Sequence, residues 1–320
     1  AACSPASTNG RLPDPELPPD PSASAAGTST SPTTGKFENP GGMWLPEQLA
    51  LQKETFKGAG FAIDAQALTK PTEFPLGAVV SLGGCSASFV SPDGLIITNH
   101  HCVTGALQFA SDPKDPAKNY MKLGFVAKTR AEEKSGGPAL RVFVTRSLTD
   151  VTSKMRDGLT NIADDLARYQ ALEDRSKELV ANCEKGKEGI RCSVVPFFGG
   201  GEYRLVEQLE IRDVRIAYAP PESIGNFGGE IDNWRWPRHG GDFSFYRAYV
   251  DPNGKPADFS EKNVPFRPPH VLKLAKTPLR AGDPVMVAGY PARTNRLTTS
   301  VEVKEAVASD IRAPEMGASR

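Results

Sequence analysis

Two adjacent histidines are the side chains in this chain best suited to acid–base chemistry. The 320 residues contain four histidines, His100, His101, His239 and His270, and the first two stand together in the run TNHHC at 98–102. An imidazole can take a proton from a hydroxyl nucleophile and later deliver it to a leaving amine. Neighbouring residues on a strand point to opposite faces, so only one of the pair can face a site. Either histidine could be the base on this ground alone, and a structural or metal-binding pair is the alternative.

A second cluster of chemically useful side chains lies between residues 226 and 244. Its nineteen residues include two tryptophans, two arginines, a histidine and several glycines, which is unusual for a plain loop. Asp242 follows two glycines and opens a predicted strand. A carboxylate there could orient a catalytic imidazole and stabilise its protonated form. Asp232 is the rival carboxylate for that role.

The cysteines indicate an oxidising compartment. Apart from Cys3, they form two local pairs: Cys85 and Cys102 flank a predicted hairpin, and Cys183 and Cys192 flank a short loop. Pairs this local can close disulfides without a large rearrangement, and disulfides persist in the periplasm or outside the cell. A loop of about 17 residues closed in this way stabilises a protein by on the order of 3 kcal/mol. A zinc site is the rival interpretation, but the spacing lacks the C-x-x-C pattern, so no metal is expected.

Short strands must position these residues. Apolar and alternating runs predict strands at 78–82, 86–90, 95–98, 139–146, 203–206, 211–218, 243–250 and 284–290. The turn sequence SPDG at 91–94 joins the second and third into a hairpin that leads directly to the histidines. Many short strands separated by Gly and Pro turns indicate an antiparallel barrel or sandwich.

Helical periodicity appears in two places. Residues 41–56 predict a helix with Pro46 in its first turn. Residues 150–183 predict one long amphipathic helix with Asp150 as its N-cap. Its apolar stripe is expected to pack on the sheet and consists of Met155, Leu159, Ile162, Leu166, Tyr169 and Leu172.

The first forty residues differ from the rest of the chain. They include 22 Pro, Ser, Thr or Gly residues, two leucines and one aromatic residue. So little apolar surface cannot offset the entropy of ordering, which predicts a disordered tether over 1–40. The Ala-Ala-Cys sequence at its start resembles the end of a bacterial lipoprotein signal, so Cys3 is expected to carry a lipid anchor. An unmodified cysteine in a disordered tail is the alternative.

The histidine segment resembles that of chymotrypsin-like serine peptidases. In those enzymes a strand ends in a histidine, followed at once by a cysteine that is bridged to the preceding strand. The resemblance implies that His101 is the general base and that Cys85 is bonded to Cys102. It also implies the order His, Asp, Ser for the three catalytic residues.

Four segments extend the resemblance to the bacterial dipeptidyl-peptidase 7 and 11 family, over about residues 40–310. They are GMWLP at 42–46, the block from 85 to 102, FGGEIDNWRWPRHGGDFSFYRAY at 227–249 and GYPARTNR at 289–296. By this resemblance Asp242 is the catalytic aspartate. Asn233 and Trp234 belong to the subsite for the free amino terminus of the substrate. An amide oxygen can accept from an ammonium group, and an aromatic face can add cation–π attraction.

The resemblance implies a mostly β fold with a helical insertion, the N-terminal chymotrypsin-like antiparallel β-barrel of a double-barrel peptidase. We expect a tether at 1–40, the barrel at 41–300 with its insertion at about 150–185, and the truncated start of a helical domain at 301–320. The chain contains no GNSG, GDSG or GxSxG sequence that would expose a nucleophilic serine. The serine is therefore expected outside this chain, and the chain alone is expected to be inactive.

The implied function is a serine-type dipeptidyl-peptidase that needs no cofactor and releases dipeptides from the free N-terminus of peptides. The family places it in the periplasm or outer membrane of a Gram-negative bacterium, and a homodimer is expected of the full-length protein. A non-catalytic, lipid-anchored peptide-binding protein is one alternative. A metal-dependent hydrolase using His100, His101 and His239 is another, although the HExxH spacing is missing. The 38 basic and 38 acidic side chains balance, which argues against nucleic-acid binding by bulk charge.

Overall fold

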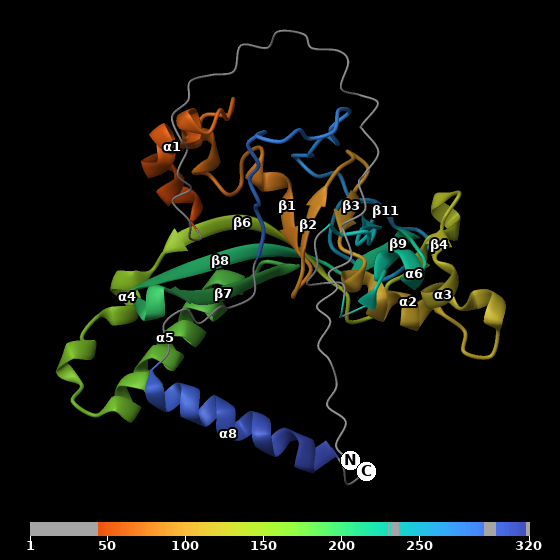
Figure 1. The fold of residues 1–320 in the computed structure, drawn as a ribbon. Coiled ribbons are helices and arrows are strands. Elements are labelled where there is room, and N and C mark those ends of the chain that lie inside the picture. The colour runs from red at the N-terminus through yellow and green to blue at the C-terminus, as the bar shows by residue number, and fades with distance from the viewer. Residues whose placement is uncertain (1–43, 230, 232–236, 291–298, 318–320) are drawn as a thin grey trace, which may run out of the picture. The chain divides into compact units, whose positions relative to one another are not determined.

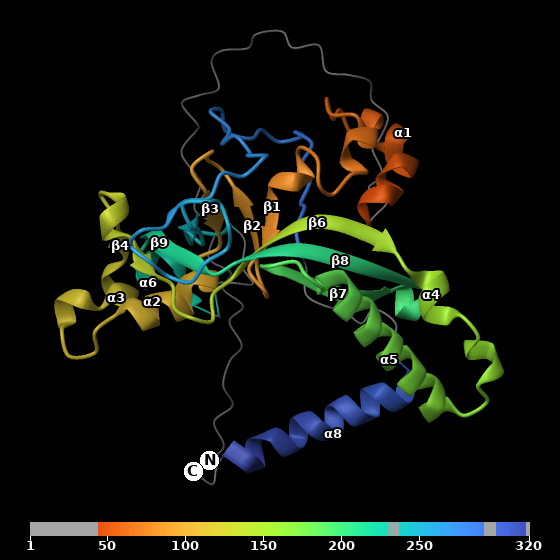
Figure 2. The ribbon, with the colours of Figure 1, turned by 180° about the vertical axis from the view of Figure 1, so that it is seen from behind.

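One antiparallel sheet organises the described part of the chain. The structure, a computed structural model, describes residues 44–229, 231, 237–290 and 299–317. Within these residues one eleven-stranded sheet has the order β4-β9-β10-β3-β2-β1-β6-β8-β7, with β11 on β10 and β5 on β9 (Figures 1 and 2). The strands are β1 Val79–Ser81, β2 Ser86–Phe89, β3 Leu95–Thr98, β4 Phe125–Val126, β5 Lys134–Ser135, β6 Val142–Asp150, β7 Ile190–Phe197, β8 Glu202–Ile211, β9 Asp213–Ala219, β10 Ser244–Val250 and β11 Val264–Pro265.

The helices are short, with two exceptions. The α-helices are α1 Lys53–Gly58, α2 Thr104–Ala110, α3 Tyr120–Leu123, α4 Thr152–Arg156, α5 Asp165–Glu184, α6 Glu222–Gly225 and α8 Ser300–Gly317. The 3₁₀ segments are η1 Pro46–Gln52, η2 Ala65–Leu68, η3 Leu76–Ala78, η4 His101–Val103, η5 Pro116–Lys118, η6 Arg130–Glu132, η7 Leu159–Asn161 and η8 Phe198–Gly200. The helix predicted over 41–56 is confirmed in part, because η1 and α1 cover residues 46–58 in two different helical forms.

The hairpin before the histidines forms as predicted. β2 and β3 pair antiparallel, and their turn is closed by the hydroxyl of Ser91, which accepts from the backbone N–H of Asp93 at 3.1 Å. Gly94 has a φ of 70°, and a Cβ there would lie 2.8 Å from the carbonyl oxygens of Ala248 and Phe266. Glycine is therefore required both by the left-handed backbone and by the close approach of β10 and of Phe266.

The apolar faces of these strands meet in one core. Inward side chains alternate along β2 and β3, as expected for strands with one buried face. The most deeply buried members come from β1, β2, β3, α2, β8, β9 and β10 and include Val80, Phe89, Ile96, Leu107, Ile211, Ile216 and Tyr246. This core fixes the ends of β3 and β10, where the histidines and Asp242 lie.

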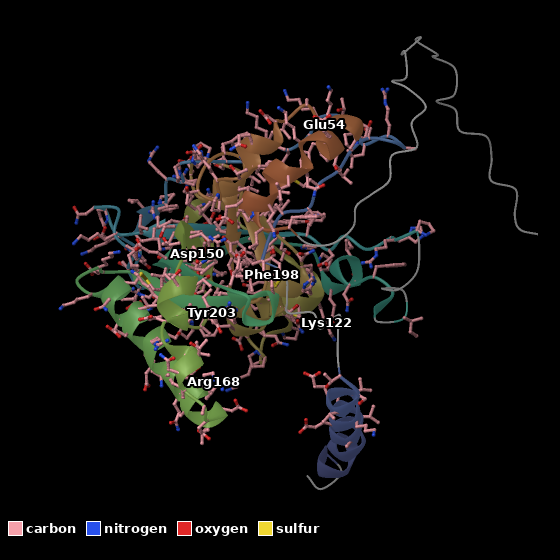
Figure 3. All side chains as sticks on the ribbon, turned by 90° about the vertical axis from the view of Figure 1, so that its left-hand side faces the viewer. Glu54, Lys122, Asp150, Arg168, Phe198 and Tyr203 are labelled. Carbon is pink, nitrogen blue, oxygen red and sulfur yellow. A yellow bond between two sulfur atoms is a disulfide. The ribbon has the colours of Figure 1, made fainter. Side chains whose placement is uncertain are left out.

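The single long helix predicted over 150–183 is wrong. Asp150 ends β6 instead of starting a helix, and its carboxylate accepts from the N–H of Thr152 before the short helix α4. Gly158 then adopts a left-handed conformation with a φ of 61°, which breaks the helical path. α5 begins after Asp164, whose side chain accepts from the N–H of Ala167 at 2.7 Å. Figure 3 labels Asp150, the last residue of β6, and Arg168 on α5.

The predicted apolar stripe is divided by that break. Met155 and Leu159 are buried, but Leu166 and Tyr169 are 64% and 60% exposed. On α5 the stripe residue Leu172 is half-buried, and no side chain of the helix is fully buried. α5 packs along β7, a strand that the sequence analysis missed, and the Cys183–Cys192 disulfide joins the two.

The strand predicted at 284–290 is also wrong. This segment is irregular, and Val285 and Val287 are 66% and 97% exposed. Its last residue is nevertheless anchored, since the N–H of Tyr290 donates to Ser86 Oγ and the phenol lies 2.7 Å from Thr145 Oγ1. The alternating apolar sequence finds no pairing strand within the described residues.

The tether predicted over 1–40, and Cys3 within it, lie outside the described residues. None of the helices that the structure describes combines the length and the apolar character needed to cross a bilayer.

Candidate active site

His101 and Asp242 meet at the ends of two neighbouring strands. Ser244 of β10 pairs with Thr98 of β3, so the residues just before Ser244 lie beside those just after Thr98. His101 Nδ1 is 3.0 Å from Asp242 Oδ2, and the backbone N–H of His101 donates to Oδ1 at 3.1 Å. The imidazole is 69% exposed and its Nε2 forms no hydrogen bond with the described residues. Nε2 is therefore open to a reacting hydroxyl.

The charge state of Asp242 suits this pairing. Partial burial favours the neutral acid, but hydrogen bonds from the backbone N–H and imidazole of His101 outweigh it and hold the pKa of Asp242 below its ordinary value. The carboxyl group loses its charge only as the pH falls through that lowered pKa. At neutral pH it is an acceptor for Nδ1–H, and that bond places the basic lone pair on Nε2.

A disulfide holds the histidine segment in place. Cys85, immediately before β2, is bonded to Cys102 with the two Cα atoms 6.2 Å apart. Cys102 follows His101 directly, and its carbonyl accepts from the phenol of Tyr246 on β10. The predicted pairs Cys85–Cys102 and Cys183–Cys192 are both present.

The structure brings His101, and not His100, to the carboxylate. His100 is 2% exposed, and its Nε2 lies 3.1 Å from the carbonyl oxygen of Pro220. A Cβ at Gly225 would overlap its ring, so α6 rests against the imidazole only because residue 225 is glycine. His100 therefore attaches the loop after β9 to the end of β3.

The other residues of the 226–244 cluster are only partly described. Asp232, Asn233 and Trp234 lie outside the described residues. The flanking residues Phe227 and His239 meet edge to face, with ring centroids 6.5 Å apart, and both are exposed.

One residue of the site escaped the sequence analysis. The side-chain amide of Asn99 donates to Asp242 Oδ2 at 3.1 Å and to its backbone oxygen at 3.3 Å. Its position next to the histidine pair was the available signal, but adjacency does not tell where a side chain points.

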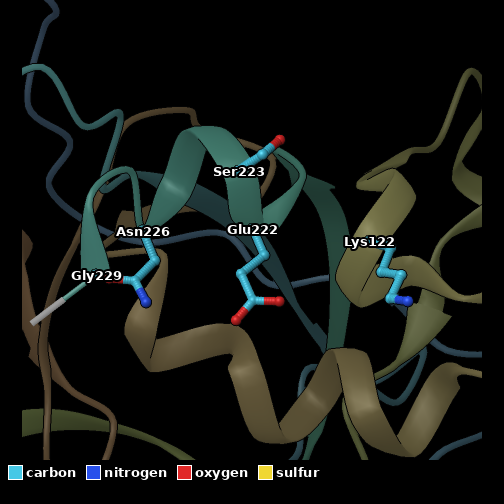
Figure 4. A pocket seen from close by; sticks show the side chains of 5 residues that line it. All are labelled: Lys122, Glu222, Ser223, Asn226 and Gly229. Carbon is cyan, nitrogen blue, oxygen red and sulfur yellow. The ribbon is translucent and has the colours of Figure 1, made fainter.

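Two hollows lie near these elements. The smaller one, ≈ 280 Å³, is lined by Ser86, Ala87, Ser88, Ile97, Thr98, Asn99, Asp242 and Phe243. The larger, ≈ 430 Å³, has Lys122 on one side and Glu222, Ser223, Asn226 and Gly229 on the other (Figure 4). Asp242 lines the smaller hollow, and neither His101 nor Asp242 lines the larger one, so we associate the acid–base geometry with the smaller hollow.

The three histidines of the metal-dependent alternative are not brought together. Among the described residues, two groups of three candidate ligands lie within 4.8 Å of one another: Cys85, His101 and Cys102, and Cys183, Cys192 and Glu207. All four cysteines are in disulfides, which are not the thiolates that bind metals. Neither group includes His100 or His239.

Known proteins resemble this chain over most of its length. An Asp/Glu-specific dipeptidyl-peptidase of Shewanella putrefaciens is 44% identical over 272 residues, 85% of this chain and 36% of that protein. A dipeptidyl-peptidase 7 of Phocaeicola vulgatus is 38% identical over 82% of this chain and 37% of its own length. The chain thus spans little more than a third of these relatives.

Solved structures also resemble this chain. The crystal structure of Porphyromonas endodontalis DPP11 in complex with the dipeptide Arg-Glu has a TM-score of 0.69 and 38% identity, covering 76% of this chain and 35% of that one. The mostly antiparallel sheet with its few helices is therefore similar to that of DPP11. The sequence profile of Peptidase S46 matches residues 40–316. With the profile spanning most of the chain, the protein belongs to the peptidase S46 family.

Proposed function

We propose that this chain is part of a serine dipeptidyl-peptidase that removes dipeptides from the free N-terminus of peptides. The observation that carries the proposal is the contact of His101 Nδ1 with Asp242 Oδ2, with Nε2 left open. Membership in the S46 family and the names of the relatives support the reaction class.

Each residue has a role in the proposed mechanism. His101 Nε2 takes the proton of the serine hydroxyl and then donates it to the leaving amine, while Asp242 stabilises the imidazolium that forms between these steps. In this proposal the serine belongs to sequence that this chain does not contain, and the relatives are more than twice as long as this chain. The strands around His101 form, in this proposal, the first of two chymotrypsin-like barrels.

Recognition of the substrate's end completes the proposal. Asn233 and Trp234 bind the substrate ammonium group, as the resemblance implies. The relatives include both Asp/Glu-specific and type 7 enzymes, so the preferred side chain is a question for a substrate panel. We place the protein in the periplasm or at the outer membrane with a lipid on Cys3, and we propose that the complete protein is a homodimer.

The test uses the complete gene product and fluorogenic dipeptidyl substrates with free or blocked amino termini. We expect dipeptide release only from the substrates with free amino termini, and serine-directed inhibitors should block it. His101→Ala and Asp242→Ala should each lower the rate by about 10⁴. Asp258→Ala is the matched control, because Asp258 is 85% exposed and pairs only with Arg212 among the described ion pairs.

Four outcomes contradict the proposal. Near-normal activity of either catalytic variant refutes that residue's role. If the 320 residues alone release dipeptides and serine-directed inhibitors block this release, the nucleophile does not lie outside the chain. Activity abolished by chelators and insensitive to serine reagents favours the metal-dependent alternative, and binding without turnover favours the peptide-binding protein.

A further inference from the structure

Asn99 immediately precedes the histidine pair in the sequence, and its side chain reaches Asp242. It stands between the end of β3 and His100, 143 residues from the aspartate. One NH₂ group donates both to Oδ2 and to the backbone oxygen of Asp242. Both of those atoms are acceptors, so the nitrogen and not the oxygen of the Asn99 amide must face the aspartate.

These bonds complete the surroundings of the carboxylate. Oδ1 accepts from the backbone N–H of His101, and Oδ2 accepts from Asn99 as well as from the imidazole. Because Asn99 holds the main chain and the side chain of Asp242 at once, it restricts rotation of the carboxylate relative to the end of β3. Donors to an ionised carboxylate also favour its charged form.

We propose that Asn99 is a positioning residue, which holds the carboxylate of Asp242 so that Oδ2 accepts from His101 Nδ1–H. The inference rests on the proposed function of His101 and Asp242. Asn99 does not touch the reacting atoms in this scheme. It acts on the rate through the aspartate, by keeping the imidazole in the orientation and tautomer that leave Nε2 free to accept a proton.

Kinetics of the complete gene product provide the first test. Asn99→Ala should lower kcat about 10- to 100-fold, the value of a hydrogen bond to a charged group, and change KM less than about twofold. Asn99→Asp should be worse, because it places a second negative charge beside Asp242. Asn119→Ala is the control: Asn119 caps α3 by accepting from Lys122 N, so the variant should keep its kcat.

A double-mutant cycle separates positioning from general structural damage. If Asn99 acts through Asp242, adding Asn99→Ala to the Asp242→Ala protein should lower kcat by less than about threefold. If Asn99→Ala lowers kcat tenfold or more both in the unmodified protein and in Asp242→Ala, the inference is overturned. If Asp242→Ala alone keeps its activity, the proposed catalytic function fails instead, so the two failures are distinguishable.

¹⁵N NMR of the histidines provides a readout that does not depend on turnover. The unmodified protein should show His101 with its proton on Nδ1, and Asn99→Ala should show a mixture of tautomers at the same pH. The His101 resonance is assigned by its loss in His101→Ala. If this resonance still shows the single Nδ1–H tautomer in Asn99→Ala, and kcat is unchanged, the inference is overturned.

Discussion

Replacing Asp242 by asparagine should reverse the tautomer of His101. The position of Oδ1 faces the backbone N–H of His101, which can only donate, so the new amide must place its oxygen there. Its NH₂ group then takes the place of Oδ2 and faces His101 Nδ1. To accept from that NH₂, Nδ1 must lose its proton, and the proton moves to Nε2. The ring then has no lone pair directed at the serine hydroxyl.

The rate should therefore fall by about 10⁴, or about 5 kcal/mol of transition-state stabilisation. The asparagine would also direct its NH₂ toward the NH₂ of Asn99, which removes one further bond. Folding should change little, because the carboxylate is 40% exposed and water can replace its partners. The assay is kcat/KM for dipeptide release by the complete Asp242→Asn protein, with thermal unfolding and ¹⁵N NMR of the histidines as controls. A loss of less than tenfold with an unchanged fold, or a proton still on Nδ1, would refute the reasoning.

Three further predictions concern the scaffold. Replacing Cys85 and Cys102 by alanine should lower the free energy of unfolding by about 3 kcal/mol, since the bridge closes a 17-residue loop, and chemical denaturation with an unchanged midpoint would contradict this. Gly225→Ala should destabilise by about 2 kcal/mol, because its methyl group overlaps the buried ring of His100; an unaltered melting temperature would show that α6 moves freely. Glu133→Ala should cost about 3 kcal/mol by removing the carboxylate that pairs with the largely buried Arg247, and a loss under about 1 kcal/mol would show that water replaces the carboxylate.

The elements nearest the site were the most predictable. The two strands and the SPDG turn before the histidines formed as expected, and so did the strand that begins beyond Asp242. In these segments the apolar residues alternate in the same way as the buried positions of the sheet, and the turn residues stand where the strands end. Local preference and tertiary packing therefore favour the same conformation there.

The errors arose where the outcome depends on distant partners. The period of 150–183 was helical, but the backbone turns at Gly158, and Leu166 and Tyr169 beyond the turn are exposed. The alternation at 284–290 is that of a strand, but a strand forms only when another supplies its hydrogen bonds. The missed strand β7 contains Pro196, which lowers strand propensity, and is held by long pairing with β8.

The sequence by itself determined the chemical groups: a histidine pair at the end of a strand, a carboxylate at the start of another, and cysteines close enough to be bridged. It left open which histidine meets the carboxylate, since side-chain direction is not a property of residue type. Tertiary structure decided this by pairing Thr98 with Ser244, which brings His101 to Asp242 across 141 residues of chain and buries His100 against Pro220. The same register gave Asn99 its role, because a contact between distant segments exists only once the core has aligned their strands.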